Sequence, residues 1–239
     1  MITLAFDSTA KAASVAVTED GKLLGLYNID NGLTQSELLL PMAENLLKSL
    51  KLGYSDIGLL AAAVGPGSFT GVRIGVSLIK GIAFGRDIPC VSVSTLEALA
   101  ENLVPLKGIL APCMDARRSQ VYNALFISDE NGIRRLTEDR AISLSELAEE
   151  LKSYTGMPVY LSGDGYGVAY KALSELGVNL SRTPELLICE NAYSIAKIAE
   201  EKYKRGEYTD DLGIAPTYLR MPQAERERLE RLENKGETK

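Results

Sequence analysis

The sequence predicts an α/β protein with two lobes, each a mixed sheet with helices, and three observations lead to this fold class. Apolar runs of strand length alternate with longer stretches of helical periodicity. The order strand–strand–strand–helix–strand–helix occurs twice without sequence identity, which indicates a structural duplication. A linker at Val104–Gly108 separates the two copies. We therefore expect an N-terminal lobe at 1–104, a C-terminal lobe at 105–215 and a charged tail at 216–239.

The first lobe opens with a meander of three strands, and Glu19-Asp20-Gly21 is the turn between the second and the third. Thr34, with Glu37 three residues later, has the spacing of a capping box and marks the start of a long helix. The expected elements are strands at 2–8, 13–18 and 22–29, a helix at 34–52, a strand at 57–64, a helix at 70–85, a strand at 89–93 and a helix at 94–103.

The second lobe repeats this order after the linker, with turn signals at 129–132 and 163–165. The expected elements are strands at 109–114, 120–128 and 133–137, a helix at 145–154, a strand at 158–161, and helices at 166–176 and 191–205. We expect the last helix to pack back on the first lobe. From Ala224 the charged tail places Glu227 and Arg231 four residues apart, which favours a solvated helix, with partner binding as the alternative.

Length and composition agree with this organisation. The chain has 239 residues, of which 46% are hydrophobic and 24% charged, as in a globular protein of two ordinary lobes. Two such copies facing a cleft are the architecture of the actin, sugar-kinase and Hsp70 superfold. The order of the elements alone leads to this expectation.

Composition also excludes several classes of function. The absence of histidine removes imidazole base catalysis, Ser-His and Cys-His nucleophiles and histidine-based zinc sites. Three widely spaced cysteines match neither a disulfide framework nor a metal site, so we expect a reducing, cytoplasmic location. There is no apolar run long enough to span a membrane and no signal-peptide pattern. A net charge of −6 disfavours strong unaided binding to nucleic acid.

The stretch Val64–Gly75 is a glycine-rich turn between a buried strand and a helix, where backbone N–H groups often bind anions. It lacks the Lys-Ser or Lys-Thr of a P-loop, so a tight turn capped by Ser68 or Thr70 is an equal alternative. Together with polar residues at other strand ends it suggests a vestigial phosphate or nucleotide cleft, whose members are Asp7, Gly67, Ser68, Asp115, Arg117 and Asp164. Each of these residues also has a purely structural interpretation, as part of a turn or a surface ion pair.

The helices expected at 34–52 and 70–85 carry more apolar surface than one core-facing stripe requires. The second also contains several glycines, which destabilise a helix interior unless they allow a close approach. We therefore predict a partner interface on these helices, and deep burial within one lobe is the alternative. The predicted interface residues are Leu38, Leu39, Met42, Leu46, Gly71, Arg73, Gly75 and Gly81.

Four motifs occur in the order known from one family. They are Asp7-Ser8-Thr9, Gly65–Gly71 with Arg73, Asp115-Ala116-Arg117, and Pro216–Arg220 followed by Ala224-Glu225. In these motifs the chain resembles the TsaB (YeaZ) family, bacterial partner proteins for the formation of threonylcarbamoyladenosine in tRNA. The resemblance extends from Met1 to about Glu225.

This resemblance implies an actin-like fold that has lost catalysis and activates its paralogue TsaD by pairing through the two helices. It also implies a homodimer in isolation, a ternary complex with TsaE, indirect contact with tRNA, no membrane, and ATP and metal only on the partner subunits. Many relatives carry a histidine where this chain has Gln35, so no metal is expected here. An ATP-dependent kinase or acyltransferase, using Asp7 and Asp164, is the main alternative, and a metallopeptidase is the weakest.

Overall fold

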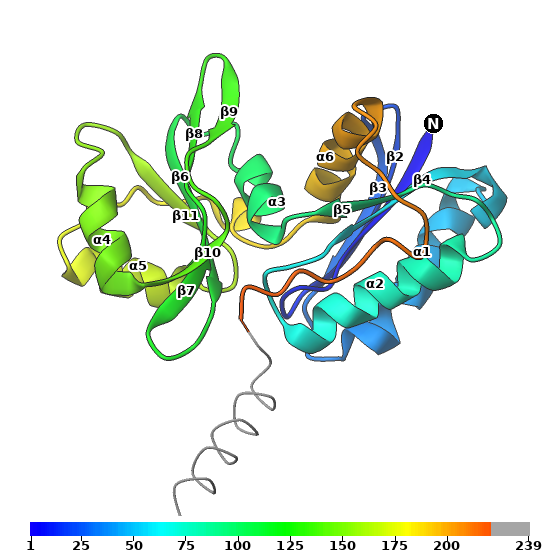
Figure 1. The fold of residues 1–239 in the computed structure, drawn as a ribbon, viewed down its shortest axis with the longest axis horizontal. Coiled ribbons are helices and arrows are strands. Elements are labelled where there is room, and N and C mark those ends of the chain that lie inside the picture. Colours follow the sequence, from blue (N-terminus) through cyan, green and yellow to red (C-terminus); the bar gives the residue numbers. More distant parts are fainter. Residues whose placement is uncertain (221–239) are drawn as a thin grey trace, which may run out of the picture.

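Two mixed β-sheets with helices form two lobes that lie next to each other in the computed structural model of the protein, which describes residues 1–220 (Figure 1). The helix predicted from Ala224 lies outside the described residues. No helix within residues 1–220 is long and apolar enough to cross a membrane. The predicted fold class is confirmed.

The first lobe is a five-stranded sheet in the order β3-β2-β1-β4-β5, with β1 antiparallel to β2 and parallel to β4. Its elements are β1 (Ile2–Asp7), β2 (Ala13–Glu19), β3 (Lys22–Ile29), α1 (Gln35–Leu50), a 3-10 turn η1 (Tyr54–Asp56), β4 (Ile57–Ala63), α2 (Phe69–Ala83), β5 (Cys90–Val93) and α3 (Thr95–Asn102). Polar caps fix the helix starts where the sequence predicts them: the Glu37 carboxylate accepts hydrogen bonds from N and Oγ1 of Thr34, and Ser68 Oγ accepts one from the Gly71 N–H.

Alternating side chains divide the core of this lobe between the two faces of its sheet. On β1, Leu4 and Phe6 face α1 and α2, whereas Ala5 faces α6 (Ala192–Lys204) on the opposite side (Figure 1). The α6 face of the sheet is rich in alanine, and so is the helix that covers it, which allows the two to approach closely. The last helix within residues 1–220, predicted at 191–205, therefore belongs to the core of the first lobe.

The second lobe repeats the topology around β6, which is antiparallel to β7 and β8 and parallel to β11. Its elements are β6 (Gly108–Asp115), β7 (Gln120–Asn123), β8 (Phe126–Asp129), β9 (Gly132–Arg135), β10 (Arg140–Ser143), α4 (Leu144–Lys152), β11 (Val159–Ser162), α5 (Tyr166–Glu175) and a 3-10 turn η2 (Glu185–Leu187). Strands β7 and β8 together occupy the position next to β6 that β2 occupies next to β1. Strands β10 and β9 pair with β7 and β8 on the outside, as β3 pairs with β2.

The prediction of one continuous strand at 120–128 is wrong. The strand is interrupted between β7 and β8, although both keep the same register against β6. In that register Ala124 lies opposite Pro112, which has no N–H to donate across the ladder. Strand β10, which pairs with β7, is absent from the predicted elements because its four residues show no alternating pattern.

A segment after α6 ties the two lobes together. It returns along the first lobe, where Thr209 and Cys90 exchange backbone hydrogen bonds and the Thr217 N–H donates to the Val64 carbonyl at 2.8 Å. We call residues 206–220 the strap. At its end Arg220 Nη1 donates to the carbonyl oxygen of Ala116 in the second lobe, at 3.1 Å.

Candidate functional site

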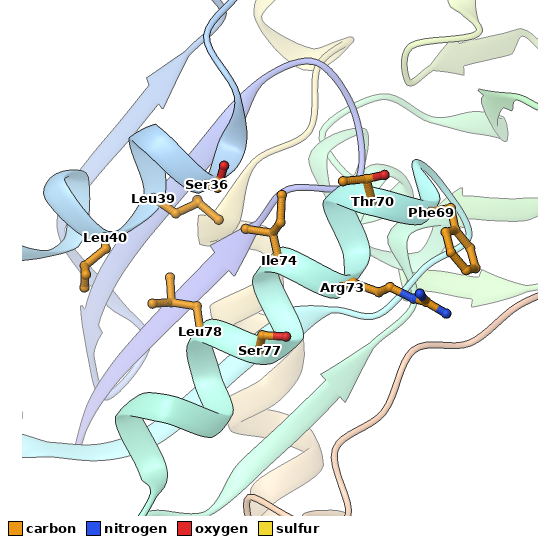
Figure 2. A pocket seen from close by; sticks show the side chains of 9 residues that line it. All are labelled: Ser36, Leu39, Leu40, Phe69, Thr70, Arg73, Ile74, Ser77 and Leu78. Carbon is orange, nitrogen blue, oxygen red and sulfur yellow. The ribbon is translucent and has the colours of Figure 1, made fainter.

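An open groove of about 510 Å³ runs between α1 and α2 on the outer side of the first lobe (Figure 2). Leu40 of α1 is 41% exposed beside it, whereas Ile74 and Leu78 of α2 are half-buried. Its lining is mostly apolar, with polar side chains at the rim: Ser36, Leu39, Leu40, Phe69, Thr70, Arg73, Ile74, Ser77 and Leu78. A groove of this composition, with no described segment of the chain in it, is a candidate docking surface.

Most of the predicted interface residues on α1 do not reach this surface. Leu39, Met42 and Leu46 are at most 4% exposed, because their spacing of three and four residues turns them toward the sheet. Leu38 is half-buried and packs at the edge of the same core. Met42 and Leu46 are therefore too buried for a direct partner contact, whereas Leu39 lines the groove and its contact with a partner stays a prediction. Leu40, which is not among the predicted residues, is the exposed leucine of α1.

The glycines of α2 have a different role from the predicted one. A Cβ atom on Gly71 would overlap the carbonyl oxygen of Ser8, and one on Gly75 would lie 2.5 Å from Ser8 Oγ. Both glycines are buried, so the close approach that they allow is to the end of β1 and not to a partner helix. Gly81 is exposed, with no atom within 4 Å of a Cβ there, and remains compatible with an interface.

Arg73 marks the end of the groove nearest the strap (Figure 2). Its guanidinium carbon lies 3.8 Å from the centre of the Phe69 ring, and its Nε donates to the Tyr218 hydroxyl at 2.8 Å. The Phe69 and Tyr218 rings stack with their centres 4.8 Å apart. The Phe69 ring and the Tyr218 hydroxyl thus hold the Arg73 guanidinium in place without a carboxylate partner.

The second candidate site is the region of the predicted cleft, where the carboxyl groups of Asp7, Asp164 and Glu190 influence one another; we keep the name cleft for this region. Asp7 Oδ1 accepts hydrogen bonds from N and Oγ1 of Thr9, whereas Asp7 Oδ2 and Glu190 Oε1 are buried without a partner among the described residues. Burial raises the pKa of Asp7 to about 6. Burial, assisted by the charges of Asp7 and Asp164, raises the pKa of Glu190 to about 8.

The structure brings most of the predicted cleft residues to this region. Asp164 Oδ1 accepts from the Asp115 N–H at 2.9 Å, and the Arg117 N–H in turn donates to Asp115 Oδ1 at 2.7 Å. Ser68 lies in the loop between β4 and α2, and its N–H donates to the carbonyl oxygen of Thr9. Gly67, in the same loop, packs against Thr9. Glu190 was missed, because a lone glutamate in a linker carries no sequence signal.

These residues do not suit a nucleoside phosphate, the ligand that the superfold implies. Two carboxylate oxygens without a partner among the described residues are buried in the cleft, and the charge of Lys11 only partly opposes the raised pKa of Asp164. A phosphate there would be repelled by at least two carboxylates once they ionise. Within residues 1–220 no group of three or more acidic or cysteine side chains is arranged to hold a metal ion.

Cysteine chemistry finds no support either. Burial raises the pKa of the Cys90 thiol to about 11 and that of the Cys113 thiol to about 12, so neither forms a thiolate at neutral pH. Cys189 is exposed, but desolvation and nearby carboxylates raise its pKa as well.

Comparison with known proteins identifies the family. A family model described as "TsaD: tRNA N6-adenosine threonylcarbamoyltransferase" matches residues 34–228. A protein of Escherichia coli (strain K12) named "tRNA threonylcarbamoyladenosine biosynthesis protein TsaB" is 32% identical over 225 residues, or 91% of this chain and 94% of that protein. The chain belongs to the TsaB family. A TsaB of Bacillus subtilis (strain 168) is 29% identical over 237 residues, covering 96% of this chain and 99% of that protein.

The fold of solved relatives agrees with the TsaB assignment. The structure described as "YeaZ from Pseudomonas aeruginosa" superposes with a TM-score of 0.75 at 24% identity, covering 91% of this chain and 99% of that one. The resemblance seen in the sequence motifs is thus confirmed. In this TsaB-family chain Gln35 is a structural residue, because its Nε2 donates to the carbonyl oxygens of Ala10, at 2.6 Å, and Lys11.

Proposed function

We propose that this chain is a non-catalytic subunit that activates TsaD for threonylcarbamoyl transfer to the adenosine next to the anticodon of tRNAs. The observation that carries the proposal is the apolar groove between α1 and α2, open to solvent on helices whose inner faces are already covered by the sheet. The names of the TsaB relatives supply the pathway.

The groove fits a partner built like the chain itself. The family model that matches residues 34–228 is named for TsaD, so the two proteins are related and TsaD is expected to present a comparable pair of helices. Helix pairs pack by inserting side-chain ridges of one into grooves of the other, and the groove lined by Leu40, Ile74 and Leu78 can receive such a ridge. The same face would pair two copies of this chain in isolation. TsaE would then join the heterodimer in a ternary complex.

The chemistry of the cleft supports a subunit without catalysis or a cofactor of its own. Asp7, whose pKa of about 6 leaves it ionised at neutral pH, repels phosphate, the buried thiols of Cys90 and Cys113 are protonated, and the sequence has no histidine to act as a base. ATP and metal are accordingly assigned to the partner subunits, and tRNA is reached through the complex. The free thiols of Cys90 and Cys113 suit a reducing compartment, for which we propose the cytoplasm.

The test is co-purification with TsaD from the same genome, followed by an assay of tRNA modification with and without this chain. Leu40→Glu places a charge in the groove and should weaken pairing about thirtyfold or more, with a matching loss of modification. Leu186→Glu is the matched control, because Leu186 is 91% exposed on η2 of the second lobe. Normal pairing of a folded Leu40→Glu variant would place the interface elsewhere, and full modification without this chain would overturn the proposed function.

A further inference from the structure

The hairpin between β6 and β7 holds two arginines in an unusual backbone conformation. Arg117, Arg118 and Ser119 have φ values of 61°, 55° and 58°, a left-handed turn that residues other than glycine adopt only with steric strain. Glycine would relieve the strain at each position. The chain nevertheless places exposed arginine side chains there, and strain that persists in a folded protein points to a function for the residues that bear it.

The guanidinium groups of Arg117 and Arg118 have no partner among the described residues. Within the part of the chain that the structure describes, the Arg117 and Arg118 guanidinium groups form no ion pair or hydrogen bond, and only the backbone N–H of Arg117 binds Asp115. In a chain of net charge −6, carboxylates are available for pairing almost everywhere. Two free guanidinium groups on a strained hairpin are therefore available to an external anion.

The hairpin continues directly into a second group of arginines and aromatic rings. Arg220 of the strap donates to the Ala116 carbonyl and to Gln120 Oε1, on either side of the strained turn, and its guanidinium lies over the Tyr122 ring. Two residues earlier, Tyr218 stacks on Phe69 beside Arg73. We call this surface the arginine rim, and it consists of Arg73, Arg117, Arg118 and Arg220 with Phe69, Tyr122 and Tyr218.

The rim combines the two kinds of group that bind RNA. Arginine forks bond phosphate oxygens, and aromatic faces stack bases. Arg73 and Arg220 are held by rings, a hydroxyl, a carbonyl and an amide, so they too keep a full positive charge. Tyr218 is 42% exposed although it stacks on Phe69, and an acidic protein would neutralise the arginines without using this exposed aromatic surface.

We propose that the arginine rim contacts the phosphate backbone of the tRNA on which the complex acts, an inference that rests on the proposed function. Asp115 and Asp164 lie behind the hairpin and oppose phosphate, so the rim adds affinity within the complex and does not bind strongly alone. Its position at the end of the α1–α2 groove places RNA next to the partner that performs the transfer.

The test uses the complex of this chain with TsaD and an unmodified tRNA transcript that has adenosine next to the anticodon. The double variant Arg117→Gly with Arg118→Gly should lower the affinity about tenfold at moderate salt and reduce the dependence of log K on log salt by about one to two. Its melting temperature should not fall, because glycine relieves the left-handed strain. The control is Arg134→Ala with Arg182→Ala, which removes the same charge from exposed positions on β9 and before η2.

Pairing with TsaD, measured by size-exclusion chromatography, separates this inference from the proposed function. Normal pairing with weakened RNA binding, in the hairpin variant only, supports the rim. Normal pairing with unchanged RNA affinity overturns the rim and leaves the proposed function intact. Loss of pairing with unchanged RNA affinity makes the rim a protein contact and also overturns it. Failure of the unaltered chain to pair overturns the proposed function, and with it the rim, which acts within the complex.

Discussion

Ser8 Oγ donates a hydrogen bond of 2.8 Å to the carbonyl oxygen of Gly71, where α2 crosses the end of β1 with no room for a side chain. Ser8 follows Asp7 of the cleft, and Gly71 lies in the first turn of a helix that lines the groove. One contact therefore joins the two candidate sites of the first lobe.

This contact predicts opposite effects for two glycines of the same helix. Gly71→Ala should destabilise the fold by about 3 kcal/mol or more, because a Cβ there overlaps the Ser8 backbone. Gly81→Ala should stabilise it by about 0.5–1 kcal/mol, because the site is open and alanine favours the helix. Chemical denaturation measures both. Equal stability of the two variants would show that α2 does not press on β1 as described.

The raised pKa of the buried Glu190 leads us to expect that the stability of the fold depends on pH. Its pKa is about 8 in the folded chain against an ordinary value of 4.5, so the folded state keeps a proton that the unfolded state releases between these values. The stabilisation is complete below pH 4.5 and is lost as the pH rises through 8. Glu190→Gln should therefore raise the free energy of unfolding at pH 9 by about 2 kcal/mol and change little at pH 4. Asp7 and Asp164 are the charged neighbours that set this shift, after burial.

Glu185→Gln is the control for this pH effect, because Glu185 is an exposed glutamate of the same inter-lobe segment. Denaturation curves of both variants from pH 4 to 9 supply the comparison. A Glu190→Gln effect of equal size at every pH would contradict a proton held by the folded state.

Replacing Arg220 should allow the second lobe to open locally at the hairpin that this residue holds. Arg220→Ala removes the hydrogen bonds from the strap to Ala116 and Gln120, so the hairpin at 116–120 should exchange its amide hydrogens faster. The loss of stability should be about 1–2 kcal/mol, as for other partly buried charged hydrogen bonds. Hydrogen-exchange mass spectrometry measures the effect, with Arg134→Ala as control. Unchanged protection of the hairpin would mean that the strap does not fasten the lobes.

From the carboxyl groups of the cleft we expect that the chain has no ATPase activity of its own. The purified chain alone should neither hydrolyse ATP nor bind it with a dissociation constant below about 1 mM, because the carboxyl groups of Asp7 and Asp164 oppose a phosphate in the cleft. Isothermal titration calorimetry and a phosphate-release assay check both statements. Turnover that is abolished by Asp7→Ala would replace the proposed subunit with an active enzyme of the same superfold.

Local signals made much of the fold predictable. The capping pair Thr34 and Glu37, the turn at 19–21 and the glycine-rich turn after β4 act over a few residues, so the sequence places them correctly. The duplicated order of elements then limits the topology to two sheets of the same plan. The motifs at Asp7, Gly65–Gly71, Asp115 and Pro216–Arg220 are contiguous, and they were sufficient to indicate the family.

Other features depend on residues that are far apart in the chain and meet only in the fold. Pro112 interrupts the strand opposite it, Glu190 enters the cleft of Asp7, and Arg220 reaches the hairpin at Ala116. Helix periodicity indicated that α1 and α2 carry surplus apolar surface, but only packing decided that Leu39 and Met42 face the core while Leu40 faces solvent. The sequence by itself determines local conformation, because short-range sterics and hydrogen bonds set it. Which side chains are buried, and which of them touch one another, is decided only when the helices and sheets pack together. The protonation of buried acids such as Glu190 follows from that packing.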